Sequence, residues 1–173
     1  MTSRLLRGEE ETAQFAEWLV QQLDTRYAHN AVVFLHGDLG AGKTTLVRGM
    51  LHALGHSGVV KSPTYTLLEP YTLPCGPIFH FDLYRINSPE ELEFVGIDEI
   101  VDGPGLKLFE WPRRAAQWLP QPDVEVTLSV VSTGGSTQAG TIESTGVSTV
   151  ENLPDSASID GANQRQVQVE FHN

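Results

Sequence analysis

Cysteine is nearly absent from this chain of 173 residues, in which Cys75 carries the only thiol. One thiol cannot close an internal disulfide, and this excludes the disulfide-stabilised scaffolds of small secreted proteins. Because Cys75 lies in a Pro-Cys-Gly-Pro turn, we interpret it as a bystander and not as a catalytic thiol. Long apolar runs are missing too. No stretch approaches the roughly 20 residues that span a bilayer, so no membrane association is expected.

Basic residues are scarce as well, with 11 Lys and Arg against 22 Asp and Glu and a net charge of −11. The longest basic run is Arg113-Arg114. Independent binding of nucleic acid needs clustered cations, so this composition argues against it. If the protein serves a nucleic-acid pathway, we expect another protein to hold the nucleic acid. The acidic run Glu9 to Glu11 stands where an export signal needs an apolar centre, and a cytoplasmic location is therefore expected.

Helical and strand patterns alternate along the chain. Apolar spacing and capping signals predict helices at 9–23, from Lys43 to a stop at Gly55, and from Ser88 onward. Short apolar or alternating runs predict strands at 31–35, 65–71, 78–84, 106–111, 124–131 and 167–171, the last as an edge strand. The alternation favours an α/β fold, a three-layer sandwich with a largely parallel central sheet and antiparallel edge strands.

One short stretch carries a complete phosphate-binding pattern. Residues 37–44, GDLGAGKT, match G-x-x-x-x-G-K-[ST], and a predicted strand and a predicted helix flank them. The three glycines allow the backbone to wrap around an anion with its N–H groups pointing inward, beside a helix N-terminus. Lys43 is expected to reach the β- and γ-phosphates, and the Thr44 hydroxyl to bind Mg²⁺. The stretch therefore predicts a P-loop for a nucleoside triphosphate.

Two carboxylates are candidates for the acidic partner that a P-loop needs. Asp82 ends the run Ile-Phe-His-Phe-Asp, and Glu110 ends Leu-Lys-Leu-Phe-Glu. One of them is expected near Mg²⁺, directly or through a water, and the other is expected to orient the attacking water. For either acid alone, a solvated residue at a strand end is an equal alternative. Which of the two contacts the metal stays open at this point.

Other motifs point away from rival sites. The chain has no Asn-Lys-x-Asp, which disfavours a guanine-specific switch protein, and Asp102-Gly-Pro-Gly105 fits a turn better than a nucleotide motif. His52 and His56 are four residues apart, but Gly55 is expected to end the helix between them. A metal site at this histidine pair is therefore disfavoured.

Composition changes abruptly at residues 132–163. Half of this segment is Ser, Thr or Gly, it holds no aromatic or basic residue, and its charges are all acidic. Such a segment cannot bury enough apolar surface to offset the entropy of ordering it. We predict a P-loop ATPase domain at 1–131, a mobile insertion at 132–163, and a final edge strand of the same domain at 164–173.

The motifs occur together in a known family. The segments GDLGAGKTTLVRG, SPTYTLLEPY, FHFDLYRI, EELEFVGIDE and FEWP follow the order and spacing of the bacterial TsaE (YjeE) ATPases. The chain resembles that family over residues 8–131 and weakly over 164–171. These proteins assist threonylcarbamoylation of the adenosine next to the anticodon in tRNAs that read codons beginning with A. The resemblance implies a P-loop NTPase fold and an accessory Mg²⁺-dependent ATPase. It also implies a TsaB–TsaD partner complex that this ATPase resets between turnovers, with tRNA contacted only indirectly.

The resemblance also assigns residues. Phosphate binding falls on Gly37, Asp38, Leu39, Gly40, Ala41, Gly42, Lys43, Thr44 and Thr45. It places Thr44 and Glu110 at the metal and Asp82 as the Walker B-like acid. It also places Ser62-Pro63-Thr64 as a switch-like segment that faces the γ-phosphate. Lys43, Thr64, Asp82 and Glu110 are thereby the expected catalytic set.

Three further residues match nucleotide contacts of the family: Trp111 beside the nucleotide, Thr12 at the start of the first helix, and Arg165 before the last strand. The chain departs from the family pattern in two places. Arg113 and Arg114 follow Phe-Glu-Trp-Pro where the family often has an acid, and the 132–163 insertion replaces a short connection.

Two other function classes compete with the accessory ATPase. A small-molecule kinase would use the same P-loop, with Arg113 and Arg114 as lid arginines on the transferred phosphoryl group. We favour instead a solvated start to a helix at 113–119, because the chain lacks a clear acceptor-binding insertion. The third class is a nucleotide-binding module without turnover. Stimulation of a slow ATPase by the partner complex would separate these classes.

Overall fold

The computed structural model describes residues 1–88, 90–131 and 164–172, and within them the strands form a single sheet. The strands are β1 (Thr2–Arg7), β2 (Val32–His36), β3 (Leu68–Leu73), β4 (Gly76–Asp82), β5 (Leu106–Glu110), β6 (Val124–Val130) and β7 (Gln164–Phe171). The helices are α1 (Gly8–Tyr27), α2 (Lys43–Ala53), α3 (Glu90–Phe94), α4 (Ile97–Asp102) and the 3₁₀ turn η1 (Pro112–Arg114). The insertion predicted at 132–163 lies outside the described residues.

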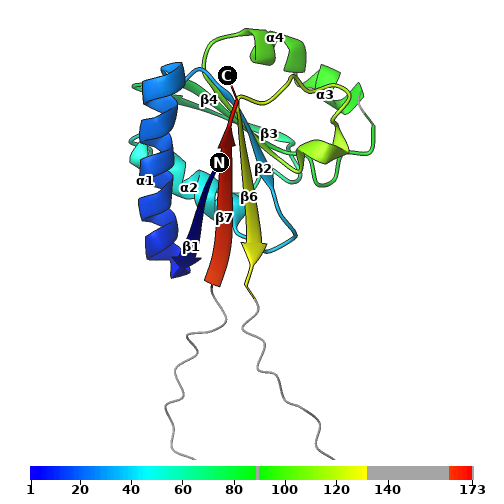
Figure 1. The fold of residues 1–173 in the computed structure, drawn as a ribbon. Helices are drawn as coiled ribbons and strands as arrows, with labels where there is room; N and C mark the ends of the chain where they lie inside the picture. Colours follow the sequence, from blue (N-terminus) through cyan, green and yellow to red (C-terminus); the bar gives the residue numbers. More distant parts are fainter. Residues whose placement is uncertain (89, 132–163, 173) are drawn as a thin grey trace, which may run out of the picture.

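The sheet has the order β1-β7-β6-β2-β5-β4-β3 (Figure 1). Its four inner strands β6, β2, β5 and β4 pair in parallel, whereas β3 on one side and β7 and β1 on the other pair antiparallel. The parallel pairing of β2 with β5 and β6 follows from the helical connections between these strands. The predicted fold class, with its parallel centre and antiparallel edges, is confirmed.

Helices cover both faces of the sheet, because apolar side chains of the strands point alternately to one face and to the other. Phe15 and Leu19 of α1 and Leu46 and Met50 of α2 pack with Leu35 and the other residues on the same face of the sheet. On the opposite face, aromatic residues of the inner strands pack against α3 and α4. These are Phe34, Phe81 and Phe109, which meet Leu92 and Ile97. The three layers of the prediction are therefore present.

The prediction that the C-terminal strand is an edge strand is wrong. Strand β7 lies between β6 and β1, with Val169 opposite both Val126 and Thr2. Val167 and Val169 are buried under α1, and the intervening residues face the other way. The alternation of apolar and polar residues therefore predicts that the two faces of the strand differ, but it does not predict which strands pair with it. The true edge is β1, whose sequence signal is weak because only Leu6 of its residues is buried.

Two predicted element bounds also move. The strand predicted from Tyr65 begins only at Leu68, because Tyr65 is 85% exposed and Leu67 takes a positive φ of 67° that a strand cannot accommodate. The helix expected at 113–119 is reduced to the three residues of η1. In both places the chain turns beside the carboxyl ends of the inner strands, where loops replace regular structure.

Candidate functional site

The phosphate-binding pattern forms the connection between β2 and α2. Its glycines adopt conformations that favour glycine, with φ of 79° at Gly40 and 102° at Gly42, where the helix is capped. Gly37 has φ of 139°, and a Cβ there would overlap the carbonyl oxygen of Leu128 on β6. The loop therefore approaches the sheet so closely at Gly37 that only glycine fits there.

Lys43 is the first residue of α2 and is buried. Its Nζ donates to the carbonyl oxygens of Gly37 at 2.7 Å and Asp38 at 2.9 Å, and it lies 3.9 Å from the ring centroid of Trp111. Burial lowers the pKa of Lys43, whereas the nearby carboxylates, Glu110 foremost, act to raise it. The ammonium is thus held by loop carbonyls at the floor of the site.

Glu110 meets the P-loop directly. It ends β5 and is buried, and its Oε1 accepts a hydrogen bond of 2.8 Å from the Thr44 hydroxyl. The same Oε1 lies 2.9 Å from Nε2 of His80 on β4. Within the described residues, no hydrogen bond reaches Oε2. The two residues expected at the metal, Thr44 and Glu110, are therefore in contact.

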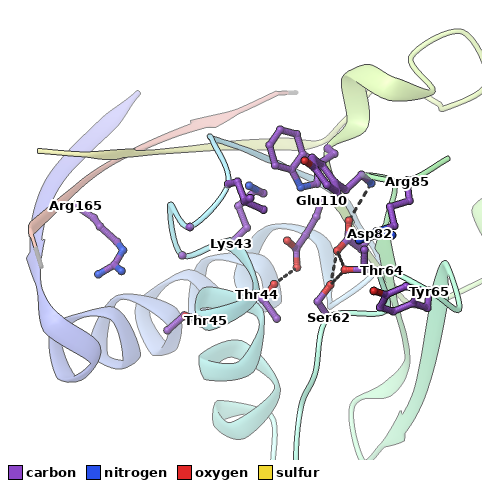
Figure 2. A pocket seen from close by; sticks show the side chains of 15 residues that line it. Lys43, Thr44, Thr45, Ser62, Thr64, Tyr65, Asp82, Arg85, Glu110 and Arg165 are labelled. Carbon is purple, nitrogen blue, oxygen red and sulfur yellow. Dashed lines mark hydrogen bonds between the residues drawn. The ribbon is translucent and has the colours of Figure 1, made fainter. Parts of the chain in front are cut away.

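Asp82 lies beside Glu110, because β4 and β5 pair in parallel with these two residues opposite each other. Its Oδ2 accepts hydrogen bonds from the hydroxyls of Ser62 and, at 2.7 Å, Thr64, and its Oδ1 accepts one from the Tyr84 amide at 3.0 Å. Figure 2 shows this cluster next to the Thr44–Glu110 pair. The two acids thus have different partners: Glu110 contacts the P-loop, and Asp82 holds the switch-like segment.

These groups line one cavity of about 540 Å³ (Figure 2). Its lining residues are Leu39, Gly40, Gly42, Lys43, Thr44, Thr45, Ser62, Thr64, Tyr65, Asp82, Tyr84, Arg85, Glu110, Trp111 and Arg165. Most of the predicted site residues are therefore gathered in one place. Ser62 lies there with Thr64 of the switch-like segment, whereas Tyr65, Tyr84 and Arg85 received no site role from the sequence. Their available signal was proximity along the chain to Thr64 and Asp82.

Four predicted residues are not part of that lining: Thr12, Gly37, Asp38 and Ala41. Thr12 is buried inside α1, where its hydroxyl donates to the Gly8 carbonyl at 2.8 Å. Ala41 belongs to the loop and is fully buried. Gly37 and Asp38 offer their carbonyls to Lys43 instead. These residues shape or support the loop in this structure, and their contact with a nucleotide stays a prediction.

Arg165 reaches the cavity from β7 and packs against the P-loop. A Cβ added to Gly42 would lie 2.9 Å from its Nε, so glycine makes room for the arginine. In Figure 2 Arg165 lies on one side of the view and Arg85 on the other, with Lys43 between them. Cationic side chains therefore occur along the cavity, which suits a polyanionic ligand.

Two aromatic side chains, Tyr84 and Trp111, also line the cavity. The rings of Trp111 and Tyr84 lie 4.9 Å apart, and the Arg114 guanidinium lies 5.7 Å from the Tyr84 ring. Arg113 lines a second, smaller cavity of about 310 Å³. Neither arginine that would serve as a kinase lid lines the first cavity.

The second cavity adjoins His36, which ends β2. Its Nε2 lies 2.8 Å from Oε2 of Glu125, whose Oε1 lies 3.4 Å from Nε2 of His172. Burial lowers the pKa of His36 below 6.5, although the Glu125 hydrogen bond and charge oppose the shift and Arg113 adds slightly to it. His36 is therefore favoured in its neutral form.

We predict that the folded protein loses stability at His36 as the pH falls. Between the lowered pKa and 6.5, the unfolded chain binds more protons at this site than the folded protein does. The contribution is therefore present above pH 6.5 and lost as the pH falls through the folded pKa. Denaturant unfolding at pH about 7.5 and about 5.5 should show that the advantage of wild type over His36→Gln shrinks at the lower pH. The exposed His52→Gln serves as control, and an unchanged difference for His36→Gln would contradict the prediction.

No group of three or more His, Cys, Asp or Glu side chains within 1–88, 90–131 and 164–172 is arranged to hold a metal ion. None of the helices in the described part of the chain has the length and apolar character to cross a membrane.

Comparisons with known proteins agree on one family. Residues 6–137 match the family described as "Threonylcarbamoyl adenosine biosynthesis protein TsaE". The chain is 50% identical over 115 residues to the tRNA threonylcarbamoyladenosine biosynthesis protein TsaE of Haemophilus influenzae, covering 66% of this chain and 71% of that protein. It is 41% identical over 128 residues to the TsaE protein of Rickettsia felis, covering 73% and 72%.

A solved structure is similar in fold. The crystal structure of Bacillus subtilis YdiB superimposes with a TM-score of 0.61 and 23% identity, covering 97% of this chain and 82% of that one. At this identity the likeness concerns the fold alone. It supports the arrangement of the sheet and helices around the P-loop.

Proposed function

The chain belongs to the TsaE family of tRNA threonylcarbamoyladenosine biosynthesis, and on that premise we propose that it binds Mg-ATP in the 540 Å³ cavity and hydrolyses it. The observation that carries the proposal is the contact between the Thr44 hydroxyl and the buried Glu110 carboxylate, beside Lys43. A P-loop lysine, a hydroxyl and an acid in one cavity are the parts that nucleotide hydrolysis requires.

Phosphate binding falls to the loop and the start of α2. Backbone N–H groups at a helix N-terminus attract anions, and Gly42 caps this helix with a positive φ. Lys43 adds a full positive charge, which burial in the cavity floor makes more effective. ATP phosphates satisfy a buried ammonium better than the two loop carbonyls that hold it here.

The residues at the proposed metal position fit Mg²⁺. Thr44 and Glu110 offer hard oxygen atoms, and Mg²⁺ in nucleotide sites is held by one or two protein ligands together with phosphates and waters. The chemistry that the ion supplies when bound is neutralisation of charge on the β- and γ-phosphate oxygens. Oε2 of Glu110, which no described residue hydrogen-bonds, is available on the same side chain.

Asp82 and Thr64 have a separate role in the proposal. Asp82 gathers the hydroxyls of Ser62 and Thr64 and so holds the switch-like segment at the cavity wall. We assign Asp82 and Thr64 to orienting the attacking water, and Glu110 with Thr44 to the metal. Different partners for two neighbouring acids are what separate roles require.

The family's partners enter the proposal as well. A cytoplasmic TsaB–TsaD complex would supply the tRNA contacts, because a net charge of −11 disfavours direct binding of tRNA by this chain. The accessory ATPase would then act on the partner's cycle. The small-molecule kinase receives no support from the geometry, since Arg113 and Arg114 do not line the cavity.

Phosphate release from ATP is the direct test. The purified chain with Mg-ATP should release phosphate slowly, and adding the TsaB–TsaD complex should raise the rate severalfold or more. A heat-denatured complex is the control for carried-over activity. Transfer of phosphate to a small acceptor without any partner would overturn the accessory role, and nucleotide binding with no release under either condition would leave only a binding module.

A further inference from the structure

His80 is a fully buried ionisable side chain that the proposed chemistry leaves without a role. It lies on β4 two residues before Asp82, so that Ile78, His80 and Asp82 point to one face of the sheet. Ile78 on that face is core, as is Leu108, the residue opposite His80 on β5. An apolar residue would suit this position by packing alone.

Among the described residues the imidazole has one hydrogen bond, and it goes to the proposed metal ligand. Nε2 lies 2.9 Å from Oε1 of Glu110, and because the carboxylate is the acceptor, the ring proton is on Nε2. Nδ1 is buried and has no hydrogen-bond partner among the described residues. A buried unpaired nitrogen costs free energy, so packing alone does not account for His80.

The two contacts to Oε1 differ in kind. The Thr44 hydroxyl belongs to the P-loop and is itself assigned to the metal, whereas His80 stands on the rigid inner strand β4. His80 is therefore the contact that fixes the Glu110 carboxylate from outside the metal set. Asp82 needs no such support, because Ser62, Thr64 and the Tyr84 amide already hold it.

We propose that His80 is a positioning residue, whose Nε2–H holds Oε1 of Glu110 so that Oε2 faces the Mg-nucleotide. The inference rests on the proposed function, because it assigns Glu110 to the metal. Hydrogen-bond partners behind a metal ligand fix its orientation, and their loss costs about 10- to 100-fold in metal affinity or activity. The expected loss is confined to steps that involve Mg²⁺.

The test compares variants that keep or remove the donor. In His80→Gln the amide nitrogen reaches the place of Nε2, whereas in His80→Asn a similar amide ends near the place of Nδ1 and withdraws the donor. His80→Leu removes the donor and keeps bulk. Ile78→Val, on the same face of β4, is the control for lost packing. Circular dichroism melts establish which variants fold, and calorimetry measures ATP affinity with Mg²⁺ and with EDTA.

We expect Mg²⁺ to strengthen ATP binding to wild type, Ile78→Val and His80→Gln. In His80→Asn and His80→Leu this gain should shrink by about 10- to 100-fold, with unchanged affinity in EDTA, and turnover should fall in parallel. If His80→Leu does not fold, the Asn and Gln pair gives the same comparison. Equal losses with Mg²⁺ and EDTA, or equal behaviour of His80→Asn and His80→Gln, would overturn the positioning role. Absence of Mg-dependent ATP binding in wild type would instead overturn the proposed function.

Discussion

Replacing Glu110 with alanine is expected to lower ATP turnover by about two to three orders of magnitude, the loss seen when one preorganised electrostatic contact is removed. Glu110 is the acid that touches the P-loop hydroxyl, at 2.8 Å from Thr44, and it is buried where charge acts strongly. ATP binding in EDTA should survive largely, because the loop amides and Lys43 are untouched, whereas the gain in affinity that Mg²⁺ gives should shrink, because a metal ligand is lost. Phosphate release and calorimetric titration at several Mg²⁺ concentrations measure the two effects separately.

Two further variants make the Glu110 result specific. Glu110→Gln removes the charge but keeps an oxygen that accepts from the Thr44 and His80 donors. Glu110→Ala would leave both donors unpaired, which lowers the free energy of unfolding by about 1–3 kcal/mol for each. Turnover should therefore fall in both variants, while the melting temperature falls mainly in Glu110→Ala. Glu125→Ala is the matched control, an acid that pairs with His36 and does not line the cavity. Wild-type turnover in Glu110→Gln would contradict the assignment.

Replacing Lys43 with alanine is expected to weaken ATP binding by about 10- to 100-fold. A hydrogen bond to a charged group contributes about 1.5–3 kcal/mol, and about 1.4 kcal/mol corresponds to a factor of ten in affinity. Among the described residues, the Lys43 ammonium donates to two loop carbonyls and lies over the Trp111 ring, with the charges of Glu110 and other carboxylates nearby. Calorimetric titration with ATP measures the loss, and thermal melts show whether the fold is kept.

Lys107 provides a control of the same kind. It is also a buried lysine whose pKa burial lowers, and its Nζ donates to the Gly103 carbonyl and, at 3.1 Å, to Asn30 Oδ1. It lies on β5 but does not line the cavity. Lys107→Ala should therefore lower stability without changing ATP affinity. If both variants lost affinity equally, a general effect of removing a buried lysine would explain the result, and Lys43 would not be a phosphate ligand.

The parts of the site that the sequence predicts are those set by local chemistry. A P-loop is a single run of residues whose glycines and lysine act together, so residues 37–44 can be read without any tertiary contact. Asp82 and Glu110 were predictable as candidates because acids at the ends of apolar strands stand out. The residue pattern alone left their separate roles open, and only the family resemblance assigned them, since the contact of Glu110 with Thr44 depends on β5 pairing with β2, the strand that leads into the P-loop.

The sequence did not predict residues whose role depends on a contact with a side chain far away along the chain. His80 sits in an apolar strand and matters through Glu110, 30 residues later, although its spacing of two from Asp82 was a readable sign of a shared face. The prediction that β7 is an edge strand was wrong for a related reason. Side-chain alternation describes the faces of β7, and its neighbours β6 and β1 are chosen by hydrogen bonding that no local pattern encodes.

The pairing of β1 with β7 sets the order in which the protein matures. Thr2 lies opposite Val169, so this side of the sheet closes only after β7 has been synthesised, more than 150 residues after β1 (Figure 1). Contacts so distant in sequence form slowly, because their loop-closure entropy must be overcome first. Arg165 arrives at the P-loop with the same strand. A nascent chain can therefore shape its phosphate loop early, but the nucleotide cavity is complete only once β7 has left the ribosome and joined the sheet.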